Sequence, residues 1–312
     1  MNAQFVVTKL FRGAMTLLLA VTFVFIVLRA SGDPVQMMLS DEASPEAIEA
    51  FRRRWGLDGS YLEQYLTYLS AILQGDFGDS FRDGRPALQV VMERVPVTLQ
   101  LGVTALLITL LVGIPAGIIA ALRRGEWVDH AAMSFTIFGQ SVPNFFLGIV
   151  LILVFSMTLR WLPSSGTGSF WHLVMPALTL ATATAATVAR FTRSSMLDVL
   201  HQPFMRTAKA KGIPHNRRVL RHALPNAAIP VVTVVGMRIG GLIGGAVTIE
   251  TVFAWPGVGM LLVNSVNQRD LAVVQAVVLL IALTMVVVNL IVDLTYGWLD
   301  PRIEVHNRKA AA

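Results

Sequence analysis

Six long apolar runs constrain the fold of this chain more than any other sequence feature. A bilayer core about 30 Å thick requires roughly 20 helical residues to cross it, and long basic side chains at the ends of a shorter run can extend it. The runs cover residues 13–28, 96–122, 131–159, 173–189, 229–249 and 271–292, and only the fifth contains a charge, Arg238. The sequence therefore predicts an all-α polytopic membrane protein with six transmembrane helices.

The first run ends near a small-x-small pair, Ala30 and Gly32, of the kind found at signal-peptide cleavage sites. The run is about as long as the longest signal core, and Asp33 and Pro34 follow the pair at once. We therefore expect this segment to be retained as a membrane helix. Its cleavage would leave five spans and an external start to the chain.

Composition and missing motifs exclude several functional classes. Of the 312 residues, 54% are apolar and 14% are charged, against about 45–50% and about 25% in soluble domains. The chain has no cysteine, no His-Glu-x-x-His pattern, no Gly-x-Ser-x-Gly elbow and no Gly-Lys-Ser/Thr phosphate loop. We therefore predict no metal site, no catalytic residue, and no cofactor bound by this chain.

The distribution of charge predicts the orientation in the membrane. Residues 31–96 hold eleven of the 19 acidic residues, whereas residues 190–228 hold eight basic residues and the single acid Asp198. By the positive-inside rule the second segment is cytoplasmic, which also places both termini inside and residues 31–95 outside. The net charge of +6 therefore reflects topology, and we expect no nucleic-acid partner.

The topology predicts four regions. Residues 1–30 form the N-terminal tail and first span, residues 31–95 an extracytoplasmic segment, residues 96–300 a five-helix core with a cytoplasmic loop at 190–228, and residues 301–312 a cytoplasmic tail. In the external segment, Ser44-Pro45 starts a short helix that Gly56 ends, and a Ser60-x-x-Glu63 capping box starts another. These amphipathic helices lie on the membrane or on the bundle, and packing is a commoner role for them than binding.

Several polar residues within the spans are candidates for a translocation pathway. Pro143 breaks the third run near its middle and frees a backbone carbonyl, which a bilayer tolerates only against protein or a watery cavity. Arg238 lies nine residues into the fifth span, where an unpaired charge costs at least about 2.5 kcal/mol. The candidates are Gln140, Ser141, Asn144, Thr182, Arg238, Asn289 and Asp293.

Each of these features also has a purely structural interpretation. Threonines such as Thr182 equally often bond their own helix. In the fifth span, Gly236, Gly240 and Gly244, with Gly241 and Gly245 beside them, favour close helix packing over a pocket.

The most informative segment is the cytoplasmic stretch 202–225, which reads QPFMRTAKAKGIPHNRRVLRHALP. Pro203 begins and Gly212 ends a helix of about nine residues, which is too short to be stable alone in water. A second short helix, 215–224, is expected to stop at Pro225. The first helix could lie on anionic lipid or dock into a groove of a soluble partner, and composition alone slightly favours membrane lipid.

This loop resembles the EAA loop of ABC importer permeases. Ala208, Gly212, Leu224 and Pro225 match the pattern, while Arg206, Thr207 and His222 replace its Glu, first Ala and Ile. The variant RTAKAKG followed by RRVLRHALPNAAIPVV is typical of the dipeptide, oligopeptide and nickel branch of the family.

Other segments resemble the same branch in the same order along nearly the whole chain. They are Gly32-Asp33-Pro34, GLDGSYLEQYLTYLSAILQGDFGDSF, RVPVTLQL, GIPAGIIAALRRGEWVD, SVPNFF, ETVFAWPGVGMLLVNSVNQRD and LDPRI. Their order and the long external segment resemble the first permease subunit of such a pair, a component of a binding-protein-dependent transport system.

The resemblance implies a type I ABC importer fold in the cytoplasmic membrane of a prokaryote. The implied partners are a second homologous permease, two ATPase subunits that bind ATP and Mg, and an extracytoplasmic substrate-binding protein. The implied ATPase-coupling residues are Phe204, Met205, Arg206, Thr207, Ala208, Lys209, Ala210, Lys211, Gly212, Leu224 and Pro225. Glu250, Trp255, Pro256 and Gly257 would form an outer gate or contact the binding protein.

The resemblance leaves the cargo open. We expect dipeptides or oligopeptides, moved by alternating access, and relatives with the same architecture carry nickel chelates, glutathione or haem. A self-sufficient secondary transporter or channel is the alternative of another class. It would require buried coupling acids and inverted repeats, and only Glu250 and Asp293 lie near the spans, at their ends.

Overall fold

A computed structural model describes residues 3–30, 43–54, 59–80 and 82–299, and in these residues every regular element is a helix. Five helices are long and apolar enough to cross a membrane, or six if one sharply bent pair counts as a single span. The predicted all-α membrane fold is thereby confirmed. The tail 301–312, the Gly32-Asp33-Pro34 segment and Gly56 lie outside the described residues, as does the side chain of Asp293.

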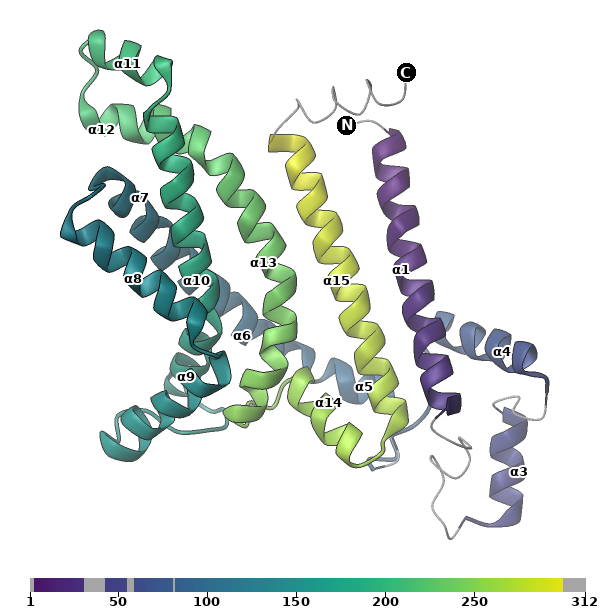
Figure 1. Cartoon of the computed structure of the whole chain (residues 1–312). Helices are drawn as coiled ribbons and strands as arrows, with labels where there is room; N and C mark the ends of the chain where they lie inside the picture. The colour runs from purple at the N-terminus through teal and green to yellow at the C-terminus, as the bar shows by residue number, and fades with distance from the viewer. Residues whose placement is uncertain (1–2, 31–42, 55–58, 81, 300–312) are drawn as a thin grey trace. The chain divides into compact units, whose positions relative to one another are not determined.

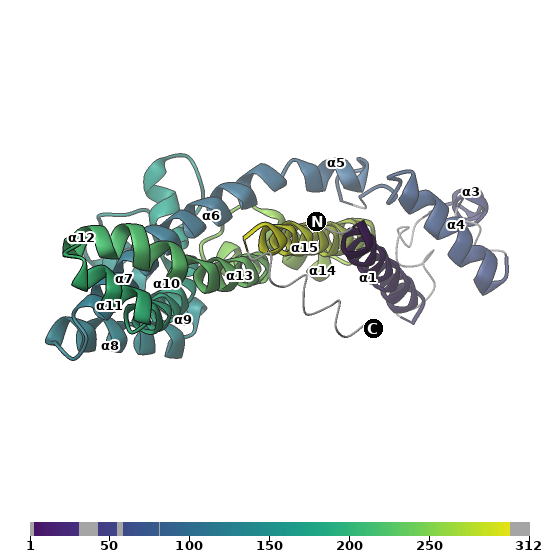
Figure 2. The ribbon, with the colours of Figure 1, turned by 90° about the horizontal axis from the view of Figure 1, so that it is seen from above.

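The chain divides into two compact units (Figures 1 and 2). The first unit is Leu99–Trp255 with the chain ends, and the second combines Ala3–Thr98 with Pro256–Leu290. Each unit is therefore described separately below. The predicted region boundaries at residues 30, 95 and 300 follow membrane topology, which is a different property from compactness.

The first unit is built around α10 (Phe170–Leu200), which packs against four α-helices and against π-helical turns next to them. The α-helices are α7 (Ile114–Leu122), α8 (Trp127–Ser141), α9 (Asn144–Leu151) and α13 (Leu224–Val252). The buried surface of α10 is rich in small residues, including Ala181, Ala185, Ala186 and Ala189. Small side chains let the backbones of neighbouring helices approach closely, as is usual between membrane helices.

The closest contact with α10 is made by two glycines, Gly113 just before α7 and Gly117 within it. The second transmembrane segment runs through α6 (Val95–Ile108), a π-helical turn η1 (Thr109–Gly113) and α7. A Cβ atom on Gly117 would lie 2.5 Å from the Ala189 carbonyl oxygen, and one on Gly113 would lie 2.9 Å from that of Ala185. The Gly113-x-x-x-Gly117 pair, which the sequence analysis did not single out, thus sets the contact with α10.

We expect Gly117→Ala to destabilise the protein by about 1–3 kcal/mol, because the added methyl group meets backbone atoms that cannot rotate away. The measurement is thermal unfolding in detergent, followed by size-exclusion chromatography. Gly244→Ala is the matched control, since its Cβ would meet no atom within 4 Å. Equal stability of the two variants would contradict the proposed close contact.

The glycine-rich part of α13 is described only in part. Gly236 is buried, whereas Gly244 has open space around it, and a Cβ on Gly245 would lie 3.2 Å from the Leu180 side chain of α10. The side chains around Gly240 and Gly241 lie outside the description. Close packing along the whole glycine series of this span therefore stays a prediction.

The predicted break in the third run is confirmed. Helix α8 ends at Ser141, α9 begins at Asn144, and the π-helical η2 (Ile152–Thr158) extends it, with a bend of 103° between the two parts. Val142 has extended backbone angles, as steric contact with the ring of Pro143 requires. The run of uncharged residues is thus one sequence segment but two differently directed helices.

The predicted stop at Pro225 is wrong. Helix α12 (His215–Arg218) continues through the π-helical η3 (Val219–Ala223) directly into α13. The wider turn bonds the Leu224 amide to the Val219 carbonyl and accommodates the proline ring. The Asn226 side chain donates to the His222 carbonyl at 2.7 Å, which satisfies an acceptor near the proline.

The second unit pairs α1 (Ala3–Ala30) antiparallel with α15 (Leu271–Leu299). Near the start of α1, a Cβ on Gly13 would lie 2.8 Å from the Val286 side chain, whereas Val21 and Val24 cluster with Leu279 further along. Helices α3 (Pro45–Arg54) and α4 (Tyr61–Leu73) belong to the same unit. The Ser44 hydroxyl accepts the Ala47 amide, and Ser60 and Glu63 form a complete capping box, so both predicted helix starts are confirmed.

Two further helices of this unit were not predicted. Helices α5 (Ala87–Met92) and α14 (Val258–Asn267) pack with the start of α15 in one apolar cluster that includes Val91, Val258 and Val273. The Val258 amide donates to the Thr98 hydroxyl at 2.8 Å. The loop after residue 250 therefore contains a structured helix of its own.

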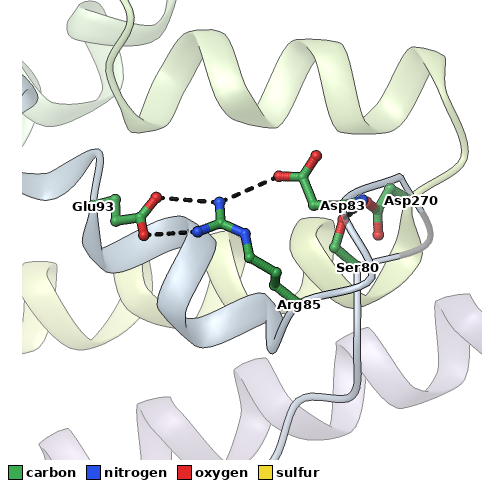
Figure 3. A network of polar contacts seen from close by, with 5 residues as sticks. All are labelled: Ser80, Asp83, Arg85, Glu93 and Asp270. Atoms are coloured by element: carbon green, nitrogen blue, oxygen red, sulfur yellow. Dashed lines mark hydrogen bonds and ion pairs between the residues drawn. The ribbon is translucent and has the colours of Figure 1, made fainter.

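A buried polar contact joins the segment before α5 to the start of α15 (Figure 3). The Ser80 hydroxyl donates to the Asp270 carboxylate at 2.5 Å, and both residues are buried. The other Asp270 oxygen accepts the Val273 amide at 3.4 Å, as expected for a residue that precedes a helix. Nearby, Arg85 forms a bidentate pair with Glu93 and lies 3.6 Å from Asp83.

We expect Asp270→Ala to destabilise the protein by about 2–3 kcal/mol, since it removes a helix cap and a hydrogen bond to a charged group. Thermal unfolding in detergent measures the loss. Arg82→Ala is the control, because it removes only the exposed hydrogen bond to Gln268 and should change stability by about 0.5 kcal/mol or less. A control as harmful as Asp270→Ala would contradict this account.

Candidate coupling loop and translocation residues

The short helix of the loop that is predicted to be cytoplasmic is α11 (Pro203–Ala210), one residue shorter than expected. It ends in a Schellman motif, in which the Ile213 amide donates to the Ala208 carbonyl and the Gly212 amide to the Lys209 carbonyl. Gly212 has a φ of 72°, and a Cβ there would meet no atom within 4 Å. Glycine is therefore required at this position for its backbone conformation and not for space.

One face of α11 packs on its own chain. Met205 and Ala208 are buried in an apolar cluster with Met196 of α10, Val219 of η3 and Ala223. This packing supplies the support that an isolated eight-residue helix lacks. Met205 and Ala208, two of the predicted coupling residues, are therefore placed where they position the helix.

The rest of α11 is exposed. Phe204 lies one turn before the buried Ala208, and its side chain is 41% exposed at the border of the packed face. Arg206 and Lys209 are exposed elsewhere around the helix. The exposed members of the predicted coupling set are Phe204, Arg206, Thr207, Lys209, Ala210, Lys211, Gly212 and Pro225, while Leu224 is half-buried. The helix thus offers a basic surface with one aromatic side chain.

A buried ion pair fixes the end of α10 that leads into this loop. Arg193 Nε and Nη2 donate to the two Asp129 carboxylate oxygens at 2.6 and 2.7 Å, and the Gly125 amide donates to Asp129 at 3.0 Å. The Asp129 side chain is 4% exposed. The pair therefore ties the turn between α7 and α8 to α10, seven residues before the last residue of that helix, Leu200.

From the sequence, Arg193 is expected only to be one of the basic residues that set the topology, and Asp129 is not among the predicted residues. A signal was present: Asp129 stands at the first turn of an apolar run, where an acid must find a partner or face water. Its partner lies 64 residues away along the chain, and no local pattern reveals that distance.

The structure brings together part of the predicted pathway. Gln140 and Ser141 are exposed at the α8–α9 break, and Asn144 is half-buried. A Cβ on the adjoining Gly139 would lie 3.3 Å from the Thr182 side chain of α10. Thr182 itself donates to the Leu178 carbonyl at 2.7 Å, as do Thr179 and Thr187 to their own helix.

Two other candidates are exposed on separate helices. Arg238 is exposed on α13, next to Met237, which is 71% exposed. Asn289 is exposed on α15 in the second unit. A charged side chain exposed along an apolar helix needs a polar partner or a watery path in the membrane.

The predicted outer residues lie mostly beneath the surface. Glu250 and Trp255 are 0% and 2% exposed, Gly257 is buried and Pro256 is half-buried. The Trp255 amide donates to the Glu250 carbonyl, and the Gly166 amide donates to that of Phe253. Glu250 and Trp255 are therefore enclosed by their own chain, and their role as an outer gate or binding-protein contact stays a prediction. Among the described residues, no group of three or more His, Asp or Glu could hold a metal.

Two regions of the chain match known protein families. Residues 113–305 match the family described as binding-protein-dependent transport system inner membrane component, and residues 2–102 match the N-terminal domain of such membrane components. The chain belongs to this family of ABC importer permeases.

Individual relatives resemble the permease along almost its full length. It is 43% identical over 301 residues to the glutathione transport system permease protein GsiC of Escherichia coli (strain K12), covering 96% of this chain and 98% of the relative. GsiC of Shigella dysenteriae serotype 1 (strain Sd197) matches to the same extent.

Solved structures share the fold of the permease. A chain of the MetNI methionine ABC transporter, in inward-facing conformations, aligns with a TM-score of 0.58 at 17% identity, covering 68% of this chain and 97% of its own. A chain of an amino acid ABC transporter crystallised with histidines gives 0.51 at 14% identity, covering 67% and 93%. These neighbours confirm the type I importer fold.

Proposed function

We propose that this permease pairs with a second homologous permease and that two separate ATPase subunits drive the pair. The observation that carries the proposal is that Met205 and Ala208 pack α11 on its own chain, while Phe204, Arg206 and Lys209 of the same helix remain exposed. A short helix held from behind can fill a groove on a partner. The chain has no Gly-Lys-Ser/Thr loop, so ATP and Mg would bind in the partners.

We further propose that the cargo is a short peptide of the glutathione type, delivered by an extracytoplasmic binding protein. The support is the 43% identity to GsiC over nearly the whole chain. Dipeptides and longer oligopeptides fall in the same chemical class, since all carry an amide backbone and a terminal carboxylate. The exposed Arg238 is the charged group in a span that could meet such a carboxylate.

The test begins with purification from the native bacterial membrane in mild detergent and identification of the accompanying subunits. The complex is then reconstituted with ATP inside the vesicles, where the ATPase subunits face inward, and labelled glutathione is supplied outside with the binding protein. We expect ATP-dependent uptake that unlabelled short peptides reduce. Competition by a nickel chelate or haem, but not by peptides, would overturn the cargo proposal and leave the permease role intact. A protein purified alone, with uptake driven by an ion gradient, would overturn both.

A further inference from the structure

Helix α4 contacts α1 at a depth that lies inside the apolar part of α1. The Tyr65 hydroxyl and the Thr22 hydroxyl are 2.7 Å apart, and the Phe25 ring lies 5.2 Å from that of Tyr65 and 5.4 Å from that of Tyr68. Thr22 and Phe25 belong to the membrane-span candidate Val7–Val27. At 1.5 Å per residue, Thr22 lies about 12 Å from the end of α1 at Ala30.

The inner face of α4 is packed against its own unit. Tyr68, Leu69 and Ile72 join a cluster with Val24 of α1 and Leu279 of α15. Helix α4 runs across α1 and not along it (Figure 1). It is therefore anchored at a fixed depth beside two membrane helices.

The remaining surface of α4 has one polar and one apolar side. Glu63, Thr67, Ser70 and Gln74 follow one another at helical spacing, and all four are exposed. Hydrogen bonds from the Ser60 amide and hydroxyl lower the pKa of Glu63, which favours its ionised form on this side. The polar side is therefore suited to water.

The apolar side is formed by leucines. Leu62, Leu66 and Leu73 are 67%, 54% and 80% exposed and lie on one stripe of the helix. On α1, residues at the same depth are also apolar and exposed, with Phe23 at 66% and Ile26 at 57%. A leucine stripe at the depth of an apolar membrane span has hydrocarbon as its natural surroundings.

We propose that α4 is an interfacial membrane helix, with Leu62, Leu66 and Leu73 among the acyl chains of the predicted outer leaflet and Glu63, Thr67, Ser70 and Gln74 in the headgroup and water layer. This assignment concerns lipid and is independent of the cargo. In this assignment α4 contacts both the bundle and the membrane. Its inner face packs on the helix bundle, and its leucine stripe contacts lipid.

Because this chain has no cysteine, an introduced cysteine is its only site for a spin label, and the complex without that cysteine gives the background from the other subunits. Leu66→Cys and, as its matched control on the polar side, Ser70→Cys are labelled with a nitroxide in the complex as purified. The samples are placed in nanodiscs of phosphatidylethanolamine and phosphatidylglycerol. Power saturation then compares collisions with oxygen, which concentrates in lipid, and with a neutral nickel chelate, which stays in water.

We expect oxygen to dominate at position 66 and the nickel chelate to dominate at position 70, so that the ratio of the two accessibilities reverses between them. Leu62→Cys should behave like Leu66→Cys, which protects the result against a local disturbance. Equal access of the nickel chelate to positions 66 and 70 would overturn the proposal in favour of water. Low access of both reagents at 62 and 66 would overturn it in favour of a protein partner on the leucine stripe.

Discussion

Replacing Asp129 by alanine is expected to destabilise the permease by about 3 kcal/mol and to uncouple ATP hydrolysis from transport. The side chain of Asp129 is almost fully buried and accepts two bonds from Arg193 and one from the Gly125 amide. Removing one member of a buried pair leaves the other charge without its partner, and that penalty typically reaches 3–5 kcal/mol. We take the lower end because Arg193 is 25% exposed.

The expected uncoupling of ATP hydrolysis from transport follows from the position of Arg193 in the chain. Arg193 lies on α10, whose end at Leu200 leads into α11 and whose Met196 packs beneath Met205. Loss of the pair frees the α7–α8 turn from the base of the loop. The purified complex should therefore retain ATP hydrolysis while uptake per ATP falls, which paired assays on the same proteoliposomes measure.

Two controls separate the pair from a general effect of charge. Asp198→Ala removes an exposed acid from the same helix and should change stability by about 0.5 kcal/mol or less. The double variant Asp129→Ala with Arg193→Ala should cost less than the sum of the single variants, because each single change strands a charge. Strict additivity would contradict a direct coupling between the two side chains.

Features with a local cause were predictable from the sequence. The Ser60 capping box, the helix start at Pro203 and the left-handed Gly212 depend on residues within one or two turns, and the structure has all three. The break at Pro143 belongs to the same class. Here the chemistry of one residue type limits the backbone wherever it occurs.

Features that depend on a distant partner were not predictable. The Asp129–Arg193 and Ser80–Asp270 contacts join residues 64 and 190 positions apart, respectively. Small residues at helical spacing occur in both α7 and α13, but only the described glycines of the α7 region press on a neighbouring backbone. Pro225 does not end the helix, because the π-helical turn η3 accommodates its ring. Val219 and Ala223 of this turn are held in a buried cluster formed with residues distant in sequence.

The second large expected effect concerns Phe204, an exposed residue of α11. Phe204→Ala should leave folding of the permease unchanged and weaken its association with the ATPase subunits by about 2 kcal/mol or more, roughly 30-fold. Phe204 is 41% exposed and stands outside the cluster that holds α11. Large aromatic side chains at the centre of an interface commonly carry such a share of its free energy.

The neighbouring residue supplies the matched control. Met205→Ala removes a buried side chain of similar size from the cluster with Met196 and Val219, so it should lower thermal stability by about 2 kcal/mol or more. Co-purification of the ATPase subunits and thermal unfolding are measured for both variants. The two variants should lose different properties, Phe204→Ala the partner and Met205→Ala the stability of the chain. If Phe204→Ala retained its ATPase subunits at full occupancy and supported normal uptake, the exposed face of α11 would not be the docking surface, and the basic residues of the loop would be left as a lipid contact.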